Sequence, residues 1–188
     1  GYTVHLGGNI GTPLFDRIAD IRPDDFAVLE LSSFQLHSMH CAPDVAIITN
    51  ISPNHLDVHP DFEDYVSAKC SIYRGQRPDG VLVLNARDAH TPRFAAEAPG
   101  SVRYFSSIGP VENGVYCSDG VIYRAHGGKA EKLIDVSDIR IPGAHNVENY
   151  MAAFAATDGL VGHEACVQVA RSFAGVPHRM ERIRELNG

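Results

Sequence analysis

Four short, nearly continuous apolar runs are the feature that most constrains how this 188-residue chain can fold. They cover residues 26–31, 45–50, 81–85 and 102–106. A strand with one face in water alternates apolar and polar residues, whereas unbroken apolar runs of this length are typical of strands covered on both faces, as in parallel sheets. The runs therefore predict a mostly parallel sheet with helices on its faces.

The segment from 61 to 73 lies between the second and third runs and has the periodicity of a helix. The residues that share one of its faces are Phe62, Tyr65, Val66, Lys69, Ile72 and Tyr73. Asp61 is placed to cap the first turn, where further acidic side chains are favoured by the helix dipole. A strand, a helix and a further strand in succession are typical of a βαβ unit, so the predicted fold class is α/β.

The second half of the chain has a different pattern. Residues 111–141 contain short runs separated by turn residues, including a turn expected at 118–120, and they predict a small antiparallel β meander. Two helices are predicted after it, at 146–160 and 164–173, with Gly159 and Gly175 as the residues that would end them. A chain of this length can bury one sizeable core, so we expect a single domain.

Charge and composition exclude several classes of protein. The formal net charge is −7, which argues against a general nucleic-acid binder because such proteins neutralise phosphates with Lys and Arg. Hydrophobic residues make up 44% of the chain, enough for a globular core. No window approaches the ~20 apolar residues of a membrane span, and the first residues lack a basic segment followed by an apolar one. We therefore expect a cytoplasmic protein.

Polar side chains follow the first two apolar runs. Glu30 stands near the end of the first, and His55 and Asp57 follow the second. In an open parallel sheet, ligands bind beyond the carboxyl ends of the strands, and a carboxylate and an imidazole from neighbouring strand ends can hold a divalent cation beside a phosphate. The alternatives are that Glu30 is only the first solvated residue after its strand and that His55 and Asp57 form a surface turn.

Lys69 lies on the apolar face of the predicted 61–73 helix, where a charged ammonium has a desolvation cost unless it is paired. One interpretation is that its long side chain reaches solvent. The other is that its pKa is lowered enough for the neutral amine to react with carbon dioxide, which would turn a cation into a carboxylate-like metal ligand. Residue types alone leave both interpretations open.

A glycine-rich segment, 7–13, lies near the start of the chain and precedes an expected helix. Such a turn can bring backbone N–H groups and the Asn9 amide close to an anionic ligand. The segment is neither a Walker A loop nor a GxGxxG fingerprint, so an ordinary loop is the alternative interpretation.

Taken together and in this order, several segments resemble the signatures of the Mur ligase family. They are Gly7–Gly11, Leu29–Leu36, Asn50–Asp57, Tyr65–Lys69 with Ile72 and Tyr73, Leu84–Ala86, Ile141–Asn146 with Asn149, and Gly175–Arg179. The resemblance implies the central ATP-binding domain of that family, a P-loop-type α/β fold. Within the family, the Glu-Leu-Ser-Ser-Phe-Gln segment favours the D-glutamate-adding members over those that add alanine, diaminopimelate or lysine, or a dipeptide.

The resemblance also implies a reaction. ATP phosphorylates the carboxylate of UDP-N-acetylmuramoyl-L-alanine, and the amine of D-glutamate attacks the acyl phosphate to form an amide of the peptidoglycan precursor. Several anionic oxygens must come together, which favours Mg²⁺ as an electrostatic clamp. By resemblance, Glu30 would hold the Mg²⁺ that bridges the ATP phosphates. His55 and a carbamylated Lys69 would hold a second Mg²⁺ near the acyl phosphate.

Further residues take binding roles by the same resemblance. Asn9 would contact the muramoyl-alanine substrate, and Ser32 and Ser33 would help to shape the same cleft. The residues that would surround the adenine and ribose are Asn146, Asn149 and Arg179. For these nucleotide contacts, helix capping or a solvated helix face is the alternative interpretation.

Parts of the family pattern are missing from residues 1–188. Family members carry a phosphate loop that ends in Gly-Lys-Ser or Gly-Lys-Thr ahead of the first glycine motif, and no GxxxxGK[ST] occurs here. The N-terminal domain for the uridine nucleotide and the C-terminal domain for D-glutamate are not included either. We therefore expect a central-domain fragment that is inactive by itself and belongs to a monomeric full-length enzyme.

Three other interpretations stay open. Another Mur ligase or a folylpolyglutamate synthetase would share the central architecture and the modified lysine. A noncatalytic scaffold would have kept the sheet and lost the phosphate loop. A metal-dependent hydrolase built on His55 and Asp57 would need a further cluster of His and Asp, which the sequence does not offer.

Overall fold

All four apolar runs form strands in the computed structural model, which describes residues 2–11, 13–53 and 59–176. The strands are β2 (Phe26–Glu30), β3 (Val45–Ile48), β4 (Val81–Asn85) and β5 (Ser101–Ser106). By its internal contacts the chain divides into two compact units. Unit 1 contains residues 1–42 and 53–75, and unit 2 contains residues 43–52 and 76–188.

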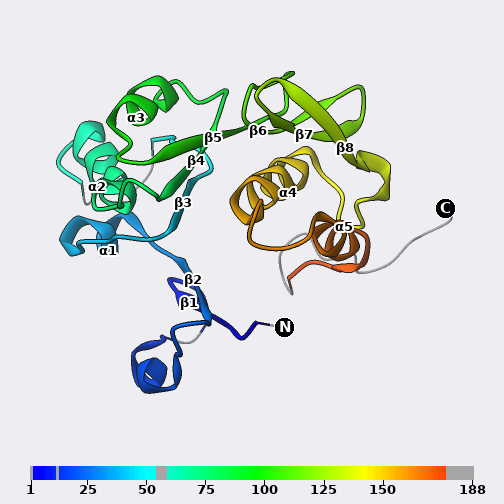
Figure 1. The fold of residues 1–188 in the computed structure, drawn as a ribbon. Coiled ribbons are helices and arrows are strands. Elements are labelled where there is room, and N and C mark those ends of the chain that lie inside the picture. Colours follow the sequence, from blue (N-terminus) through cyan, green and yellow to red (C-terminus); the bar gives the residue numbers. More distant parts are fainter. Residues whose placement is uncertain (1, 12, 54–58, 177–188) are drawn as a thin grey trace, which may run out of the picture. The chain divides into compact units, whose positions relative to one another are not determined.

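Unit 2 is built on a six-stranded sheet in the order β3-β4-β5-β6-β7-β8 (Figure 1). The strands that complete it are β6 (Gly114–Ser118), β7 (Val121–His126) and β8 (Lys129–Asp135). The pairings from β3 to β6 are parallel, and those from β6 to β8 are antiparallel. The predicted meander is therefore confirmed, and it continues the parallel sheet because β6 pairs in parallel with β5.

The hairpin turn between β6 and β7 lies where the sequence predicts it. Asp119 has a φ of 51° and Gly120 a φ of 76°. Two consecutive residues with positive φ are typical of a type I′ turn, whose twist matches that of the flanking strands, and Asp-Gly is a preferred pair for it. Local residue chemistry is therefore enough to specify this hairpin.

The helical segments of unit 2 include both helices predicted near its C-terminal end. They are α3 (Thr91–Glu97), the 3-10 helix η2 (Val136–Asp138), α4 (Ala144–Thr157) and α5 (His163–Ser172). α4 starts at Ala144 rather than at residue 146, so the Asn-rich start of the predicted helix lies inside its first turns. α4 packs against β4, β5 and β6, as expected for a helix that covers a sheet face.

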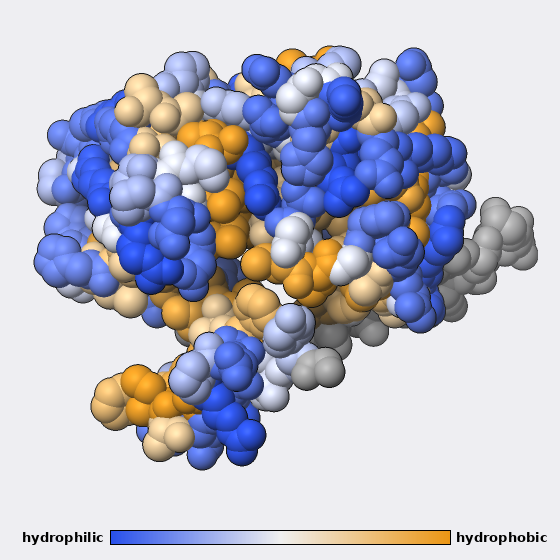
Figure 2. Space-filling model, in the orientation of Figure 1, coloured by the Kyte–Doolittle hydropathy of each residue, from blue (hydrophilic) through white to orange (hydrophobic). Residues whose placement is uncertain are grey.

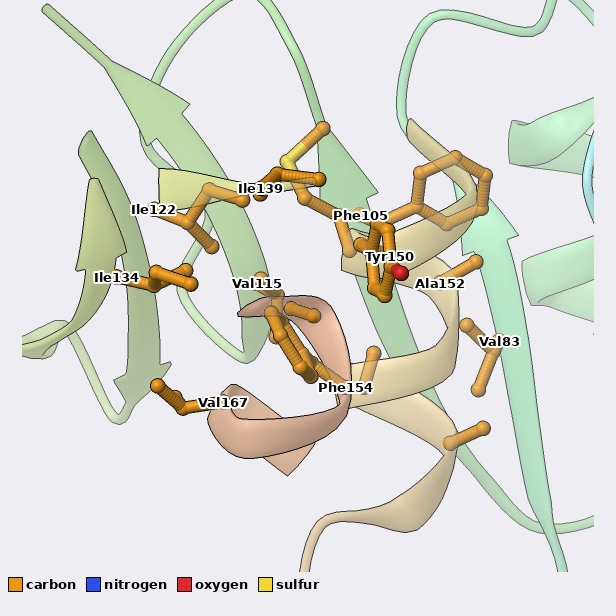
Figure 3. Packing of buried hydrophobic residues seen from close by; sticks show 14 residues of the cluster. Val83, Phe105, Val115, Ile122, Ile134, Ile139, Tyr150, Ala152, Phe154 and Val167 are labelled. Atoms are coloured by element: carbon orange, nitrogen blue, oxygen red, sulfur yellow. The ribbon is translucent and has the colours of Figure 1, made fainter. Parts of the chain in front are cut away.

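The core of unit 2 lies between the sheet and the helices α4 and α5. Figure 3 shows side chains from the strands and from both helices gathered in one layer. Among its fully buried members are Val83, Phe105, Val115, Ile122, Ile134 and Met151. Burial of this apolar surface, at roughly 25 cal/mol per Å², is what holds α4 and α5 on the sheet.

Replacing Ile122 with Val should lower the free energy of unfolding of unit 2 by ~1 kcal/mol, because a methylene is removed from a fully buried side chain and a small cavity is left. Ile108→Val is the matched control. Ile108 is 71% exposed, so its change should stay below about 0.5 kcal/mol. Urea unfolding followed by circular dichroism measures both, and equal losses would contradict the core position of Ile122.

Unit 1 holds the remaining elements. They are β1 (Val4–Gly8), the 3-10 helix η1 (Phe15–Asp20), β2, α1 (Ser33–Ser38) and α2 (Phe62–Arg74). β1 pairs in parallel with β2, and α1 packs against α2. The sequence predicts that β2 and β3 are neighbouring strands. Among the described residues β2 pairs with β1, β3 pairs with β4, and no pairing joins β2 to β3.

The glycine-rich segment differs from its prediction. Gly7 and Gly8 end strand β1, and residues 9–11 form a bend directly after it. The helix that follows is the short 3-10 element η1. The reason is tertiary, since parallel pairing with β2 provides partners for the backbone groups of this segment and so favours a strand where glycines alone indicate a turn.

The helix predicted at 61–73 is confirmed as α2. The Asp61 carboxylate accepts the backbone N–H of Asp64 at 2.8 Å, so Asp61 is the N-cap that the sequence predicts. Tyr65 and Tyr73, from the predicted apolar face, are buried. Because Tyr65, Lys69 and Tyr73 are spaced four residues apart, burial of the two tyrosines places Lys69 on the same side of α2.

Some apolar side chains of unit 1 are exposed, notably Phe15 and Ile18 of η1. Figure 2 shows apolar surface on the N-terminal segment that carries η1. Contiguous apolar surface of this kind is typical of contact sites. Among the helices that the structure describes, none has both the length and the apolar character needed to span a membrane.

Candidate functional site

Asn9 and Glu30 lie side by side at the carboxyl ends of the parallel strands β1 and β2. The strand register pairs Gly8 with Glu30. The backbone N–H of Asn9 donates to the carbonyl oxygen of Glu30 at 2.7 Å, and the Asn9 amide Nδ2 donates to Glu30 Oε1 at 3.4 Å. Two residues that the sequence singles out separately therefore share one exposed polar edge, where parallel α/β sheets bind their ligands.

Gly8 allows this close approach of the two strand ends. Its φ is +101°, a conformation that L side chains rarely adopt. A Cβ at this position would lie 2.2 Å from the carbonyl oxygen of Glu30. The backbone of Glu30 can therefore lie where it does only because Gly8 has no side chain.

Lys69 projects from α2 in the same unit. Its Nζ lies 5.9 Å from the centre of the Tyr65 ring, and the side chain is partly buried. Burial lowers the pKa of Lys69, while the negative charge of Glu30 acts in the opposite direction and raises it. The desolvation effect is the larger, so a greater fraction of Lys69 is a neutral, nucleophilic amine than for a lysine in water.

The structure thus describes two of the three predicted metal ligands, Glu30 and Lys69, and places both in unit 1. Glu30 and Lys69 belong to one unit and interact electrostatically. His55 and Asp57 lie outside the described residues. A carboxylate and a lysine with a lowered pKa are the part of the predicted cation site that the structure describes.

Ser32 and Ser33 open the short helix α1, directly after β2. Ser32 is its N-cap: its hydroxyl accepts the backbone N–H of Gln35 at 3.2 Å, and its own backbone N–H donates to Gln35 Oε1 at 2.9 Å. This reciprocal pair is a capping box, and its Ser-x-x-Gln signature is visible in the sequence. The strand therefore turns into a helix immediately beyond Glu30, which directs both serines to the same end of the sheet.

Replacing Ser32 with Ala should destabilise unit 1 by ~1 kcal/mol, because α1 loses the side chain that caps its first turn. Ser32→Thr keeps the hydroxyl and should recover most of that loss. Thermal unfolding of the two variants and the parent chain, run in parallel, measures the difference. An Ala variant as stable as the Thr variant would show that the capping box contributes nothing.

A hydrogen-bonded chain that the sequence does not reveal begins at Ser33. Its Oγ lies 2.9 Å from His59 Nε2, and His59 Nδ1 lies 2.7 Å from Asp64 Oδ2. Serine, histidine and aspartate stand in this order in hydrolase triads. Here Ser33 is only 2% exposed, so no substrate carbonyl can reach its oxygen. These hydrogen bonds instead position α1 against α2.

The predicted nucleotide-binding residues are on unit 2. Asn146 and Asn149 lie three residues apart near the start of α4, a spacing that puts both on one face of the helix. The Asn146 amide donates to the carbonyl oxygen of Pro142 at 2.6 Å, which holds the turn before α4, and Asn149 is exposed. Arg179 lies outside the described residues.

Solved structures share the fold of this chain. One of them is MurF from Acinetobacter baumannii, which has a TM-score of 0.64 and 18% sequence identity. The match covers 100% of this chain and 48% of the MurF chain. Another is a pseudomurein peptide ligase type C from Methanothermus fervidus, with a TM-score of 0.65 and 17% sequence identity. That match covers 96% of this chain and 51% of the pseudomurein ligase chain. This chain therefore has the α/β fold that these ligases share, in agreement with the predicted fold class.

The family follows from sequence comparison. The family model described as the Mur ligase middle domain matches residues 6–157, and the chain belongs to the Mur ligase family. The UDP-N-acetylmuramoylalanine--D-glutamate ligase of Acetivibrio thermocellus is 49% identical over 188 residues, and that of Ruminiclostridium cellulolyticum is 47% identical over the same length. In both cases the match covers 100% of this chain and 40% of the relative.

Proposed function

We propose that this chain is the central ATP-binding domain of a ligase that adds D-glutamate to UDP-N-acetylmuramoyl-L-alanine during synthesis of peptidoglycan precursors. The observation that carries the proposal is the identity of 47–49% with D-glutamate ligases along the whole length of the chain. Because the chain spans 40% of those relatives, the activity is proposed for the complete ligase, in which further regions act with residues 1–188. The reaction consumes ATP, and we expect it in the cytoplasm with the ligase as a monomer.

In the proposed reaction the substrate carboxylate attacks the γ-phosphorus of ATP, and ADP leaves. The amine of D-glutamate then attacks the carbonyl carbon of the acyl phosphate, loses a proton and displaces inorganic phosphate. Every participant is anionic, so Mg²⁺ would supply charge neutralisation for the crowded oxygens. The exposed Glu30 carboxylate, together with His55, has the donor chemistry to hold such ions.

Lys69 takes a role in this proposal only after modification. Its partly buried amine has a lowered pKa and can attack the carbon of carbon dioxide, which forms an N–C bond and releases a proton. The product is a carbamate, an anionic oxygen ligand in place of a cation. Glu30 and carbamylated Lys69 would then both favour Mg²⁺, whereas an unmodified ammonium would repel it.

The substrates would be positioned by the remaining predicted residues. Asn9 shares the strand edge with Glu30 and can hydrogen-bond the muramoyl-alanine substrate, while Ser32 and Ser33 shape the cleft by fixing the start of α1. For the adenine and ribose we assign Asn146, Asn149 and Arg179.

Release of phosphate from ATP tests the proposed function. The complete gene product would receive UDP-N-acetylmuramoyl-L-alanine and ATP with D-glutamate, L-alanine, L-lysine, meso-diaminopimelate or D-alanyl-D-alanine in separate reactions. We expect release only with D-glutamate, and only with Mg²⁺ present. Turnover with a different amino acid would point to another Mur ligase. A further reaction with a folate substrate and L-glutamate in place of these substrates would detect a folylpolyglutamate synthetase, and no turnover in any reaction would point to a noncatalytic scaffold.

A further inference from the structure

Three potential metal ligands of unit 1, none of them Glu30 or Lys69, converge in the structure. His37 comes from the last turn of α1, His59 from the segment before α2, and Asp64 from the first turn of α2. His59 Nδ1 lies 2.7 Å from Asp64 Oδ2, and His37 Nε2 lies 3.3 Å from Asp64 Oδ1. One ligand atom from each residue can be chosen so that all three atoms lie within 4.8 Å of one another.

This spacing is close to that of ligands around a small ion. With metal–ligand bonds of about 2.0–2.1 Å, tetrahedral geometry puts the ligand atoms roughly 3.3–3.4 Å apart. The Asp64 separations already lie near or below that value. His37, whose side chain is 57% exposed, has the freedom to close the remaining gap and leaves one side open to a water ligand.

The His59 ring is held in a suitable orientation before any ion binds. The residue is 4% exposed, its ring stacks on Phe34 at 5.4 Å between centroids, and it meets Tyr65 edge to face at the same distance. Its Nε2 contacts Ser33 Oγ at 2.9 Å, which leaves Nδ1 as the atom presented to Asp64. Metal-bound histidines are typically oriented in this way, by a polar neighbour at the ring nitrogen that does not bind the metal.

Asp64 is prepared to act as an anionic ligand. The hydrogen bond from His59, and after it that from His37, holds the pKa of this carboxyl below its ordinary value despite an opposing effect of burial. Its backbone N–H donates to Asp61 at the start of α2, which fixes where the side chain leaves the helix. The carboxylate is therefore ionised at neutral pH, as metal binding requires.

We propose that His37, His59 and Asp64 form a binding site for a transition-metal ion of the Zn²⁺ type, with water as a further ligand. Two imidazole nitrogens and one carboxylate suit Zn²⁺, whereas Mg²⁺ prefers oxygen ligands in octahedral geometry. None of these three residues is a ligand in the Mg²⁺ site of the proposed function. A bound ion would join α1, which carries Ser32 and Ser33, to α2, which carries Lys69, and would stabilise the folded form of unit 1.

Titration of the complete gene product with ZnCl₂, in excess Mg²⁺, tests the site by calorimetry. Co²⁺ would serve as the spectroscopic probe, since four-coordinate Co²⁺ absorbs far more strongly in the visible range than the hexaaqua ion. We expect saturable Zn²⁺ binding and these strong Co²⁺ bands. His37→Ala should weaken Zn²⁺ binding at least ~10-fold, and Asp64→Asn should do the same.

Two control variants separate this site from other histidines. His40→Ala removes an exposed histidine of the same unit and should leave the Zn²⁺ affinity within about twofold of the parent value. His55→Ala removes the histidine assigned to the Mg²⁺ site and should also leave Zn²⁺ binding in place. Circular dichroism of each variant checks that the fold is kept, and the isosteric Asp64→Asn provides a second reading if His37→Ala disturbs α1.

Three results would overturn the proposal. The first is no Zn²⁺ binding up to about 1 mM. The second is binding that survives in both His37→Ala and Asp64→Asn, and the third is binding that His55→Ala abolishes while His37→Ala leaves it unchanged. None of these results depends on whether D-glutamate is the amino acid that the ligase uses.

Discussion

Replacing Lys69 with Ala should lower kcat/KM of the complete ligase about 10²–10³-fold, the typical loss when one preorganised electrostatic partner of the transition state is removed. The physical reason is the lowered pKa of this partly buried amine, which makes a carbamate attainable and with it an anionic ligand for Mg²⁺. ATP-dependent phosphate release, measured with D-glutamate and UDP-N-acetylmuramoyl-L-alanine, gives the value.

Lys69→Arg separates the two interpretations of this residue. Arginine keeps a positive charge but stays protonated and forms no carbamate, so we expect a loss as large as for Lys69→Ala. Lys129→Ala removes an exposed lysine on β8 and should leave kcat/KM within about twofold of the parent. An Arg variant with near-normal activity would mean that Lys69 acts as a simple cation, and the carbamate would have to be abandoned.

Gly8→Ala should destabilise unit 1 by ~2–4 kcal/mol and also impair catalysis, because two penalties combine at this position. The backbone has a φ of +101°, and the added Cβ would lie 2.2 Å from the Glu30 carbonyl oxygen. The end of β1 or of β2 must therefore move, and either shift changes the position of the Glu30 carboxylate relative to the Asn9 amide. Urea unfolding measures the first effect and phosphate release the second.

Gly11→Ala is the matched control for the clash at Gly8. Gly11 also has a positive φ, +68°, but the nearest atom to an added Cβ is the Leu6 carbonyl oxygen at 3.9 Å. Only the conformational penalty applies there, so the loss should be about 1 kcal/mol. Equal losses for the two glycine variants would show that the contact between Gly8 and Glu30 does not constrain the strand ends.

The elements that could be predicted are those specified by local pattern. The apolar runs became β2 to β5, the 61–73 periodicity became α2 with Asp61 as its cap, and the Asp119-Gly120 pair became the β6–β7 turn. In each case the signal that predicts the element lies in residues that are close to one another along the chain. Strand β1 was not predicted, because Gly7 and Gly8 have no side-chain pattern of their own and depend on pairing with β2.

The candidate site divides in the same way. Glu30 and Lys69 could be singled out from the sequence because each places a charge in an apolar pattern, and the family resemblance assigned their roles. That the Glu30 charge acts on the Lys69 amine, and that the Asn9 amide reaches the Glu30 carboxylate, became visible only in the folded chain. Both contacts join residues that are distant in sequence, and their distances depend on the pairing of β1 with β2 and the position of α2.

The amino-acid sequence by itself determined the α/β class, the family and the residue types available for binding phosphate and metal, because these are properties of runs and motifs. The tertiary structure alone decided that His37, His59 and Asp64 meet, since α1 and α2 must pack before a histidine from each side can reach one carboxylate. Apolar burial along the chain can be read from periodicity, whereas the meeting of polar groups requires the distances that only packing sets.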